Sequence, residues 1–180
     1  MTAPTPSSAA TPALLDGWGA RIKDDRWCFL ADDQGIEDCS DVVLSLDRLE
    51  EMAEQLQGRN GRLGALLRAG EDVERLAPFL EQLDLVAVEF PIFKDGRGYS
   101  AARLLRGRFA YEGELRAVGM VLEDQLFFLM RCGFDAFALR HPDPEAAFHR
   151  AARTFRNAYQ RASDARLSIA EQRRQEAEKK

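Results

Sequence analysis

The residue types best suited to chemistry lie together in one short segment, Asp95-Gly-Arg-Gly-Tyr-Ser100, directly after Lys94. Gly96 and Gly98 allow backbone conformations with positive φ, and backbone amides at the start of a helix attract anions. We therefore expect an anion-binding turn with Asp95 as a candidate base. Its candidate ligands are Lys94, Gly96, Arg97, Gly98, Tyr99 and Ser100. The alternative is a tight turn without a ligand, in which Ser100 caps the following helix.

Two charged residues interrupt apolar segments that have the composition of strands. Glu89 lies near the end of one segment, residues 85–90, and Arg116 lies within another, residues 114–118. Burying a lone charge is costly, so each is expected to be paired, exposed or functional. If the two strands are neighbours, Glu89 and Arg116 either pair in the core or join the anion site. In the site, Arg116 would hold the anion and Glu89 would orient it or act as a base.

The elements that position these residues alternate between strand and helix. Apolar runs predict strands, and segments with apolar residues at helical spacing predict helices. The predicted pairs are a strand at 85–90 with a helix at 101–108, 114–118 with 121–132, and 134–139 with 144–159. This alternation implies parallel strands joined by right-handed crossovers. Ligands in such folds bind at the carboxyl ends of the strands, where the 95–100 turn is expected to lie.

The N-terminal half is expected to add further elements before this repeat. Short strands are predicted at 26–30, 42–46 and 62–69, with helices over 47–57 and 71–83. The predicted fold class is therefore α/β, with repeated strand–helix units and about four parallel strands in an open sheet or partial barrel. A small N-terminal β element is expected to precede the sheet, and a long C-terminal helix is expected to follow it.

Composition places these elements in a single domain. The chain has 180 residues, of which 46% are hydrophobic, enough for one substantial core. Residues 1–20 are expected to be a disordered leader, because their first part is rich in Ser, Thr, Ala and Pro. Residues 21–160 are expected to form the α/β domain. The charged, alanine-rich residues 161–180 form a tail that is either helical or disordered.

Charge and motif content exclude several classes of function. The net charge of −5 argues against general nucleic-acid binding, and no apolar segment reaches the length of a membrane span. The three cysteines and two histidines lack metal-ligand spacing, and nucleotide and nucleophile-elbow motifs are missing. We expect no cofactor, no metal, no nucleic-acid or membrane partner, and a reduced, cytoplasmic protein. The residues leave open whether the chain is an enzyme, and its oligomeric state.

The predicted 121–132 helix carries a contiguous apolar run, residues 127–130, and ends at Cys132. One helix face cannot cover all four residues of the run, so they indicate either core on two sides or an interface with a partner. Cys132 is expected to be a small buried side chain. Six arginines on the predicted helices are expected to be solvated, or to dock an acidic partner. They are Arg103, Arg106, Arg108, Arg150, Arg153 and Arg156.

Four segments in order resemble a proteobacterial family, the domain of unknown function numbered 934. They are Phe90-Pro-Ile-Phe-Lys-Asp-Gly-Arg-Gly-Tyr-Ser-Ala-Ala-Arg-Leu-Leu-Arg106, Gly113-Glu-Leu-Arg-Ala-Val-Gly119, Asp124-Gln-Leu-Phe127 and Arg131-Cys-Gly-Phe-Asp-Ala-Phe137. The resemblance covers roughly residues 66–159. Members are often labelled oxidoreductases and are typically encoded beside assimilatory sulfite or nitrite reductase genes. The resemblance therefore implies an accessory role in assimilatory sulfate or sulfite reduction, with sulfite reductase or its electron donor as partner. The alternative is an α/β enzyme or binding protein for a small oxyanion or phosphorylated metabolite. A purely structural scaffold is a third.

Overall fold

One curved sheet of seven strands organises the protein. The computed structural model describes residues 12–36, 39–155, 159–164 and 167–178. The strand order is β1-β7-β6-β5-β4-β3-β2, and only β1 is antiparallel to its neighbour. The strands are β1 (Ala13–Asp16), β2 (Trp27–Phe29), β3 (Asp41–Ser45), β4 (Leu63–Leu67), β5 (Leu85–Phe90), β6 (Glu114–Val121) and β7 (Ala136–Leu139).

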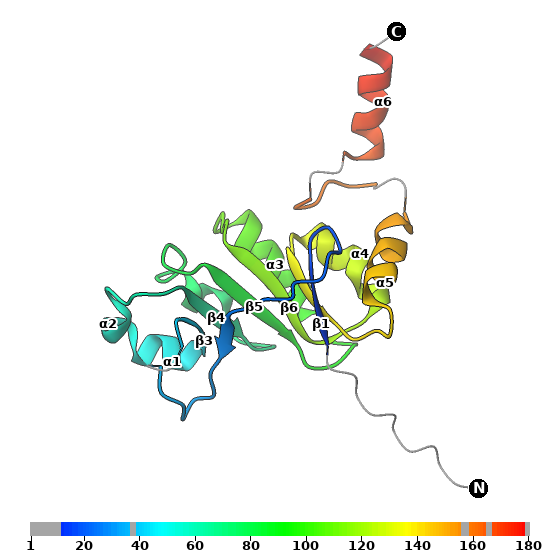
Figure 1. Cartoon of the computed structure of the whole chain (residues 1–180). Coiled ribbons are helices and arrows are strands. Elements are labelled where there is room, and N and C mark those ends of the chain that lie inside the picture. Colours follow the sequence, from blue (N-terminus) through cyan, green and yellow to red (C-terminus); the bar gives the residue numbers. More distant parts are fainter. Residues whose placement is uncertain (1–11, 37–38, 156–158, 165–166, 179–180) are drawn as a thin grey trace, which may run out of the picture.

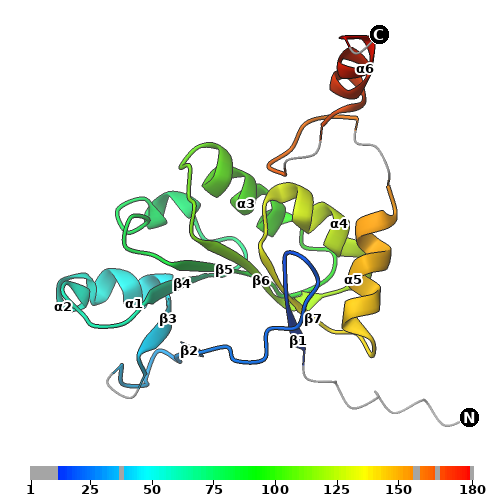
Figure 2. The same cartoon turned by 45° about the horizontal axis from the view of Figure 1, so that its top comes forward.

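Except for α6, the helices lie along one face of this sheet (Figures 1 and 2). Strands β2 to β7 follow one another across the sheet in sequence order. Right-handed crossovers between successive parallel strands then place every connecting helix on the same side, as in part of a barrel. The helical elements are α1 (Leu46–Glu51), α2 (Ala53–Leu56), the 3₁₀ helix η1 (Val73–Leu76), α3 (Arg97–Gly107), α4 (Glu123–Cys132), α5 (Pro144–Arg153) and α6 (Ile169–Glu178).

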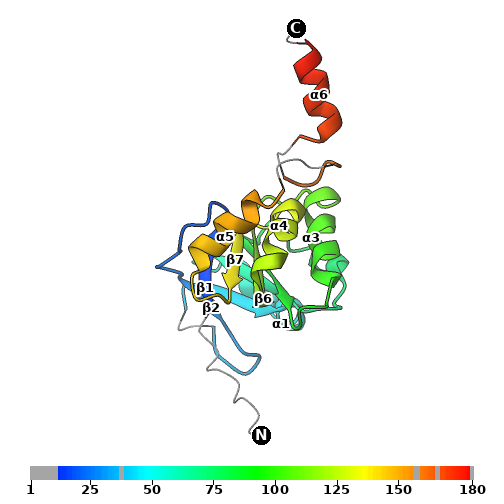
Figure 3. The ribbon, with the colours of Figure 1, turned by 90° about the vertical axis from the view of Figure 1, so that its right-hand side faces the viewer.

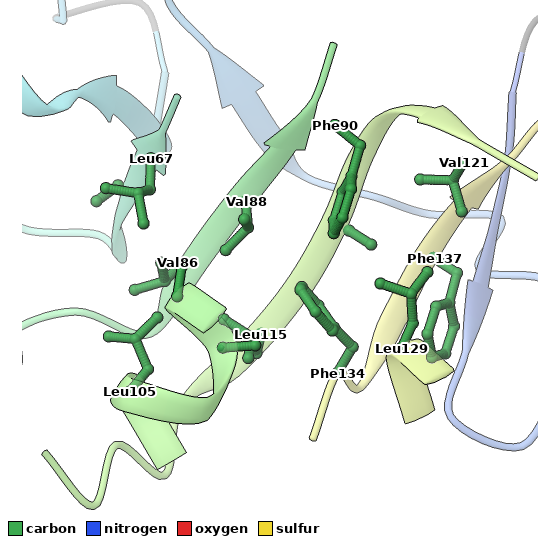
Figure 4. Close-up of a cluster of buried hydrophobic side chains, with 14 of the residues drawn as sticks. Leu67, Val86, Val88, Phe90, Leu105, Leu115, Val121, Leu129, Phe134 and Phe137 are labelled. Atoms are coloured by element: carbon green, nitrogen blue, oxygen red, sulfur yellow. The ribbon is translucent and has the colours of Figure 1, made fainter. Parts of the chain in front are cut away.

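The main core fills the space between the sheet and these helices. Alternate strand residues point to the helices, and side chains of α3 and α4 meet them (Figure 4). Members that are almost fully buried include Val86, Phe90, Leu105, Leu115, Leu129 and Phe137. Because apolar burial is the main favourable term in folding, this layer fixes α3 and α4 against β5 and β6.

The opposite face of the sheet is covered differently. A smaller apolar cluster lies there, made of Trp27, Val43, Leu85 and Ala87. The segment between β1 and β2 runs across the sheet from one edge to the other (Figure 2). It brings Asp25 to Arg116. The neighbours of Arg116 in β6, Leu115 and Ala117, face the main core on the helix side, so Arg116 points to the opposite face of the sheet. The two faces of the sheet therefore have separate interiors.

The predicted α/β class and the mainly parallel strands are confirmed, and of the two sheet forms left open the structure has the partial barrel. The predicted number of strands was too low. We expected about four parallel strands behind a small N-terminal β element. Instead, β2, β3 and β4 continue the same parallel sheet as β5, β6 and β7. The reason is that each early strand pairs with the next one in sequence, so no boundary separates an N-terminal unit.

The ends of the chain also differ from expectation. Within the predicted leader, Ala13–Asp16 form β1 at the sheet edge, because an apolar edge strand gains hydrogen bonds from β7. The predicted 144–159 helix ends at Arg153, and α6 is a separate helix that extends away from the domain (Figure 3). Residues 1–11 of the leader, residues 156–158 of that helix, and residues 165–166 and 179–180 of the tail lie outside the described residues.

Two predicted helices are shorter than expected. The 47–57 segment is divided at Met52 into α1 and α2, and most of the 71–83 segment forms turns around η1. Val73 and Leu76, two of the apolar residues at helical spacing in 71–83, are buried although the segment forms only short turns. Burial of these residues therefore does not require a continuous helix. Among the described residues, no helix combines the length and apolar character needed to cross a membrane.

Candidate functional site

A cavity of about 260 Å³ lies at the carboxyl ends of β4 and β5. One wall is the loop after β4, residues 68–72, and the other is the start of α3. Val88 and Leu67 contribute apolar lining from the two strands. The polar lining comes from residues of both walls, namely Arg68, Glu71, Asp72, Arg97 and Ser100. The position agrees with the general rule that parallel sheets bind ligands beyond the carboxyl ends of their strands.

Helix α3 begins earlier in the sequence than predicted, within the 95–100 segment itself. Gly96 is the N-cap, and the Asp95 Oδ1 accepts a hydrogen bond from the Arg97 amide at 3.1 Å. Ser100 therefore lies inside the helix and lines the cavity, so the alternative in which Ser100 caps the helix is wrong. Asp95 takes the capping role instead, because its carboxylate reaches an amide of the first turn.

Gly98 serves packing in this segment, whereas a Cβ on Gly96 would point into open space. Neither Gly96 nor Gly98 has a positive φ, so the conformational freedom that these glycines allow is not used here. Gly98 is instead required by close approach, since a Cβ there would lie 2.5 Å from the Phe90 Cζ. The first turn of α3 thus sits directly on the end of β5, which is what brings Arg97 and Ser100 to the cavity.

Asp95 holds the Arg97 guanidinium in a fixed orientation. The Arg97 Nε donates to Oδ1 at 2.9 Å and Nη2 donates to Oδ2 at 2.6 Å. The Arg97 hydrogen bonds lower the pKa of Asp95 to about 2. A carboxylate this acidic is a poor general base near neutral pH, so the structure favours Asp95 as a positioning residue for Arg97.

The third guanidinium nitrogen of Arg97 is directed at the opposite wall. A Cβ placed on Gly70 would lie 2.5 Å from the Arg97 Nη1. Gly70 also has φ +96°, a conformation that disfavours other residues. No hydrogen bond of this Nη1 occurs among the described residues, so it is available to a ligand in the cavity. Gly70 is therefore a functional candidate, because it leaves room for Arg97 to reach across.

The acidic groups of the cavity are already engaged by the backbone. Glu71 Oε2 accepts the amide of Arg68 at 2.6 Å, and Asp72 Oδ1 accepts the amide of Glu74 at 2.9 Å. The Arg68 guanidinium lies at the rim, with Nη2 3.6 Å from a carboxylate oxygen of Asp32. Both carboxylates therefore already have hydrogen-bond donors of their own, and the two arginines are the groups suited to an anionic ligand.

Sequence reasoning missed Arg68 and Gly70. We expected the strand to continue to residue 69, and this hid the fact that the chain leaves β4 after Leu67. The available signal was Arg68-Ala-Gly-Glu-Asp72, a charged segment with a central glycine directly after an apolar strand. By the rule that sites gather at carboxyl strand ends, it could have been placed beside the 95–100 segment.

Other predicted site residues lie outside the cavity. Lys94 and Gly96 are exposed and do not line it. Tyr99 faces away from it, against Phe90, with ring centroids 5.3 Å apart in an edge-on arrangement. Of the predicted anion ligands, the structure therefore brings together Arg97, Gly98 and Ser100.

Arg116 and Glu89 do not join this site. The Arg116 Nη1 contacts Asp25 Oδ2 at 2.7 Å and its Nε contacts Glu114 Oε1 at 2.7 Å, with the residue only 2% exposed. Glu89 lies opposite Val118, between two strand residues that face the helices, and so points to the other side of the sheet. The expected Glu89–Arg116 pair is wrong, because Asp25 and Glu114 reach the guanidinium instead.

The acidity of Asp95 gives a pH-dependent prediction. Its folded pKa of about 2 lies below the ordinary 3.8, so the ionised side chain stabilises the fold above about pH 4. This contribution is lost as the pH falls from about 4 towards 2. We expect thermal unfolding to show wild type more stable than Asp95→Asn at pH 6, with the difference shrinking below pH 4.

Asp33→Asn is the matched control, because the exposed Asp33 makes no ion pair among the described residues. Its difference from wild type should stay small throughout the titration. A difference between wild type and Asp95→Asn that persists unchanged down to pH 2.5 would contradict the assigned pairing of Asp95 with Arg97.

No group of three or more His, Cys, Asp or Glu side chains suited to a metal ion occurs in the part of the chain that the structure describes. Comparison with protein families finds a match to bacterial proteins of unknown function (DUF934) over residues 64–170. This range is more than half of the chain and includes both walls of the cavity. A search among curated proteins finds no match.

Proposed function

The chain belongs to the DUF934 family of bacterial proteins of unknown function, and on that premise we propose that its cavity binds a small anion. The ligand class is an oxyanion or a small phosphorylated metabolite. The observation that carries this proposal is the arrangement of Arg97. Asp95 fixes two of its nitrogens, and the third is directed at Gly70 across the cavity.

The size and chemistry of the cavity support the same ligand class. A volume of about 260 Å³ is below the range of drug-sized ligand pockets, which begin at about 300 Å³. Arg68 and Arg97 offer charge-assisted hydrogen bonds, and the Ser100 hydroxyl offers a neutral one. Apolar lining from β4 and β5 lowers the local dielectric and so strengthens these interactions. Small tetrahedral or trigonal oxyanions fit such a set of donors.

A thermal-shift series tests this proposal. Sulfite, sulfate and phosphate are each added in steps to the purified protein at constant ionic strength. We expect at least one of them to raise the unfolding temperature in a saturable way, with about 2.7 kcal/mol of stabilisation at one hundred times its Kd. Arg97→Ala should remove most of that effect, because a charge-assisted hydrogen bond contributes about 1.5–3 kcal/mol.

Arg153→Ala is the control in this series, since Arg153 is an exposed arginine on α5 outside the cavity. It should respond to the anion as wild type does. If none of the anions stabilises the protein, or if Arg97→Ala responds as strongly as wild type, the anion site is refuted.

The second proposal concerns the cellular role. We propose that the protein is a cytoplasmic accessory factor of assimilatory sulfate or sulfite reduction, acting with sulfite reductase or its electron donor. Membership of the DUF934 family supports this role, because the four ordered segments of the chain carry the resemblance that implies it. The chemistry of the cavity supports it as well. Sulfite is a small oxyanion of the class for which the cavity is suited, and sulfite reduction consumes it.

Growth on a defined sulfur source tests this role. A deletion strain should grow slowly with sulfate as sole sulfur source, and cysteine should restore growth. A tagged wild-type copy should restore growth on sulfate and co-purify with a sulfite reductase component. A copy with Arg97→Ala should be expressed but fail to restore growth. Normal growth of the deletion strain on sulfate would argue against the accessory role while leaving the anion site to its own test.

A further inference from the structure

A second cavity, of about 450 Å³, lies on the other side of α3 from the proposed anion site. Helices α3 and α4 lie side by side there (Figure 3), and residues 160–162 contribute a third wall. The lining consists of Tyr99, Arg103, Phe128, Arg131, Cys132, Gln160, Arg161 and Ala162. None of these residues lines the first cavity, so the two sites can be altered separately.

Helical spacing explains why these side chains meet. Tyr99 and Arg103 are four residues apart on α3 and share one face. Phe128 lies three residues before Arg131 and four before Cys132, so these residues share one face of α4. The regular helices therefore build most of the cavity, which makes its shape a property of the fold and not of a loop alone.

The charges of this cavity are only partly balanced. Arg131 donates to Asp164 and to the carbonyl oxygen of Gln160, and Arg161 pairs with Glu171. Arg103 has no carboxylate partner among the described residues, and no carboxylate belongs to the lining. About one positive charge is therefore left for a ligand, which favours an anion.

An aromatic surface accompanies this charge. Phe128 is 53% exposed, although its neighbours Phe127 and Leu129 on α4 are buried. Phe127 meets it edge-on at a centroid distance of 5.5 Å and so helps to fix the orientation of its ring. An exposed, oriented ring beside the Arg103 guanidinium offers one partner for a flat apolar group and one for an acid group.

We propose that this cavity binds an anion that carries a flat aromatic ring, which is the chemistry of a nucleotide or an aromatic acid. Arg103 binds the acid group, and Phe128 packs against the ring. Cys132 lines the same cavity, so a bound ligand shields its thiol from reagents. Burial raises the pKa of this thiol, which slows but does not prevent its alkylation.

The test uses 8-anilinonaphthalene-1-sulfonate, a fluorescent aromatic anion, with the full-length protein at low ionic strength. We expect saturable binding that weakens as salt is added. Arg103→Ala should weaken it about tenfold or more, the effect of losing a charge-assisted hydrogen bond. Arg103→Lys should retain more affinity than Arg103→Ala. At saturation, alkylation of Cys132 by iodoacetamide, followed by peptide mass spectrometry, should slow while that of Cys28 is unchanged.

A neighbouring groove between α4 and α5 requires a specific control. Phe128 also lines that groove, together with Phe155, which does not line the proposed site. Phe155→Ala and Arg97→Ala should therefore bind the probe as wild type does, while Phe128→Ala binds it weakly. The absence of saturable binding, equal binding by Arg103→Ala and wild type, or unchanged alkylation of Cys132 would each overturn the proposal. Circular dichroism of each variant confirms that the fold is retained.

Discussion

Replacing Arg116 by alanine is expected to lower the free energy of unfolding by about 3 kcal/mol. The Arg116 side chain is 3% exposed and holds both Asp25 and Glu114, whose side chains are each 30% exposed. Removing the cation leaves two neighbouring carboxylates partly buried and uncompensated. Breaking a buried ion pair in this way costs about 3–5 kcal/mol, and the partial exposure of both partners places this case at the lower end.

Urea unfolding of wild type and Arg116→Ala measures this effect. Arg21→Ala is the matched control, because its pair with Glu145 has side chains 45% and 50% exposed and should contribute at most about 1 kcal/mol. Anion affinity at the β4–β5 cavity should be the same in all three proteins. An Arg116→Ala variant of wild-type stability, or one that loses anion affinity, would contradict the placement of Arg116 on the opposite face of the sheet.

Phe90→Ala is expected to destabilise the protein by about 3–5 kcal/mol, the usual cost of removing a buried aromatic ring. Phe90 is 1% exposed and lies at the end of β5 (Figure 4). Its ring packs against Tyr99 and Phe134 at centroid distances of 5.3 and 5.9 Å. It also supports Gly98, so its loss removes the surface on which the first turn of α3 rests.

This substitution should affect the anion site as well as stability. Without the ring, the first turn of α3 loses its support, and Arg97 loses its fixed position across the cavity. Phe90→Leu should retain more stability and more anion affinity, because a smaller void remains. Anion affinity is compared at a temperature where each variant is fully folded. A Phe90→Ala variant that is destabilised but binds the anion as wild type does would show that Arg97 is positioned by Asp95 alone.

Much of the fold was predictable because its strands are short apolar runs with clear ends. Segments 85–90 and 114–118 were placed correctly, although β6 continues to Val121. Sequence periodicity reports which face of an element is apolar, but it does not report which strands pair. The strands at 27–29 and 41–45 were therefore predicted individually, while their membership of the same sheet was not.

The candidate site was predictable to a similar extent. Arg97 and Ser100 were placed beyond a strand end by a local rule, and the structure puts them there. Arg116 was misplaced because its partner Asp25 lies 91 residues away in the sequence and reaches it only across the folded sheet. Gly98 was assigned to backbone freedom, whereas its small size is needed against Phe90, a contact that only the tertiary structure reveals.

The most direct test of the anion site is a calorimetric titration of the purified protein with sulfite, repeated with sulfate and phosphate. We predict a single saturable site per chain for at least one of these anions. Arg97→Ala should weaken its affinity about tenfold or more, while Arg116→Ala, measured where it is folded, leaves it unchanged. No binding of any of the three anions, or equal binding by wild type and Arg97→Ala, would contradict the proposed function.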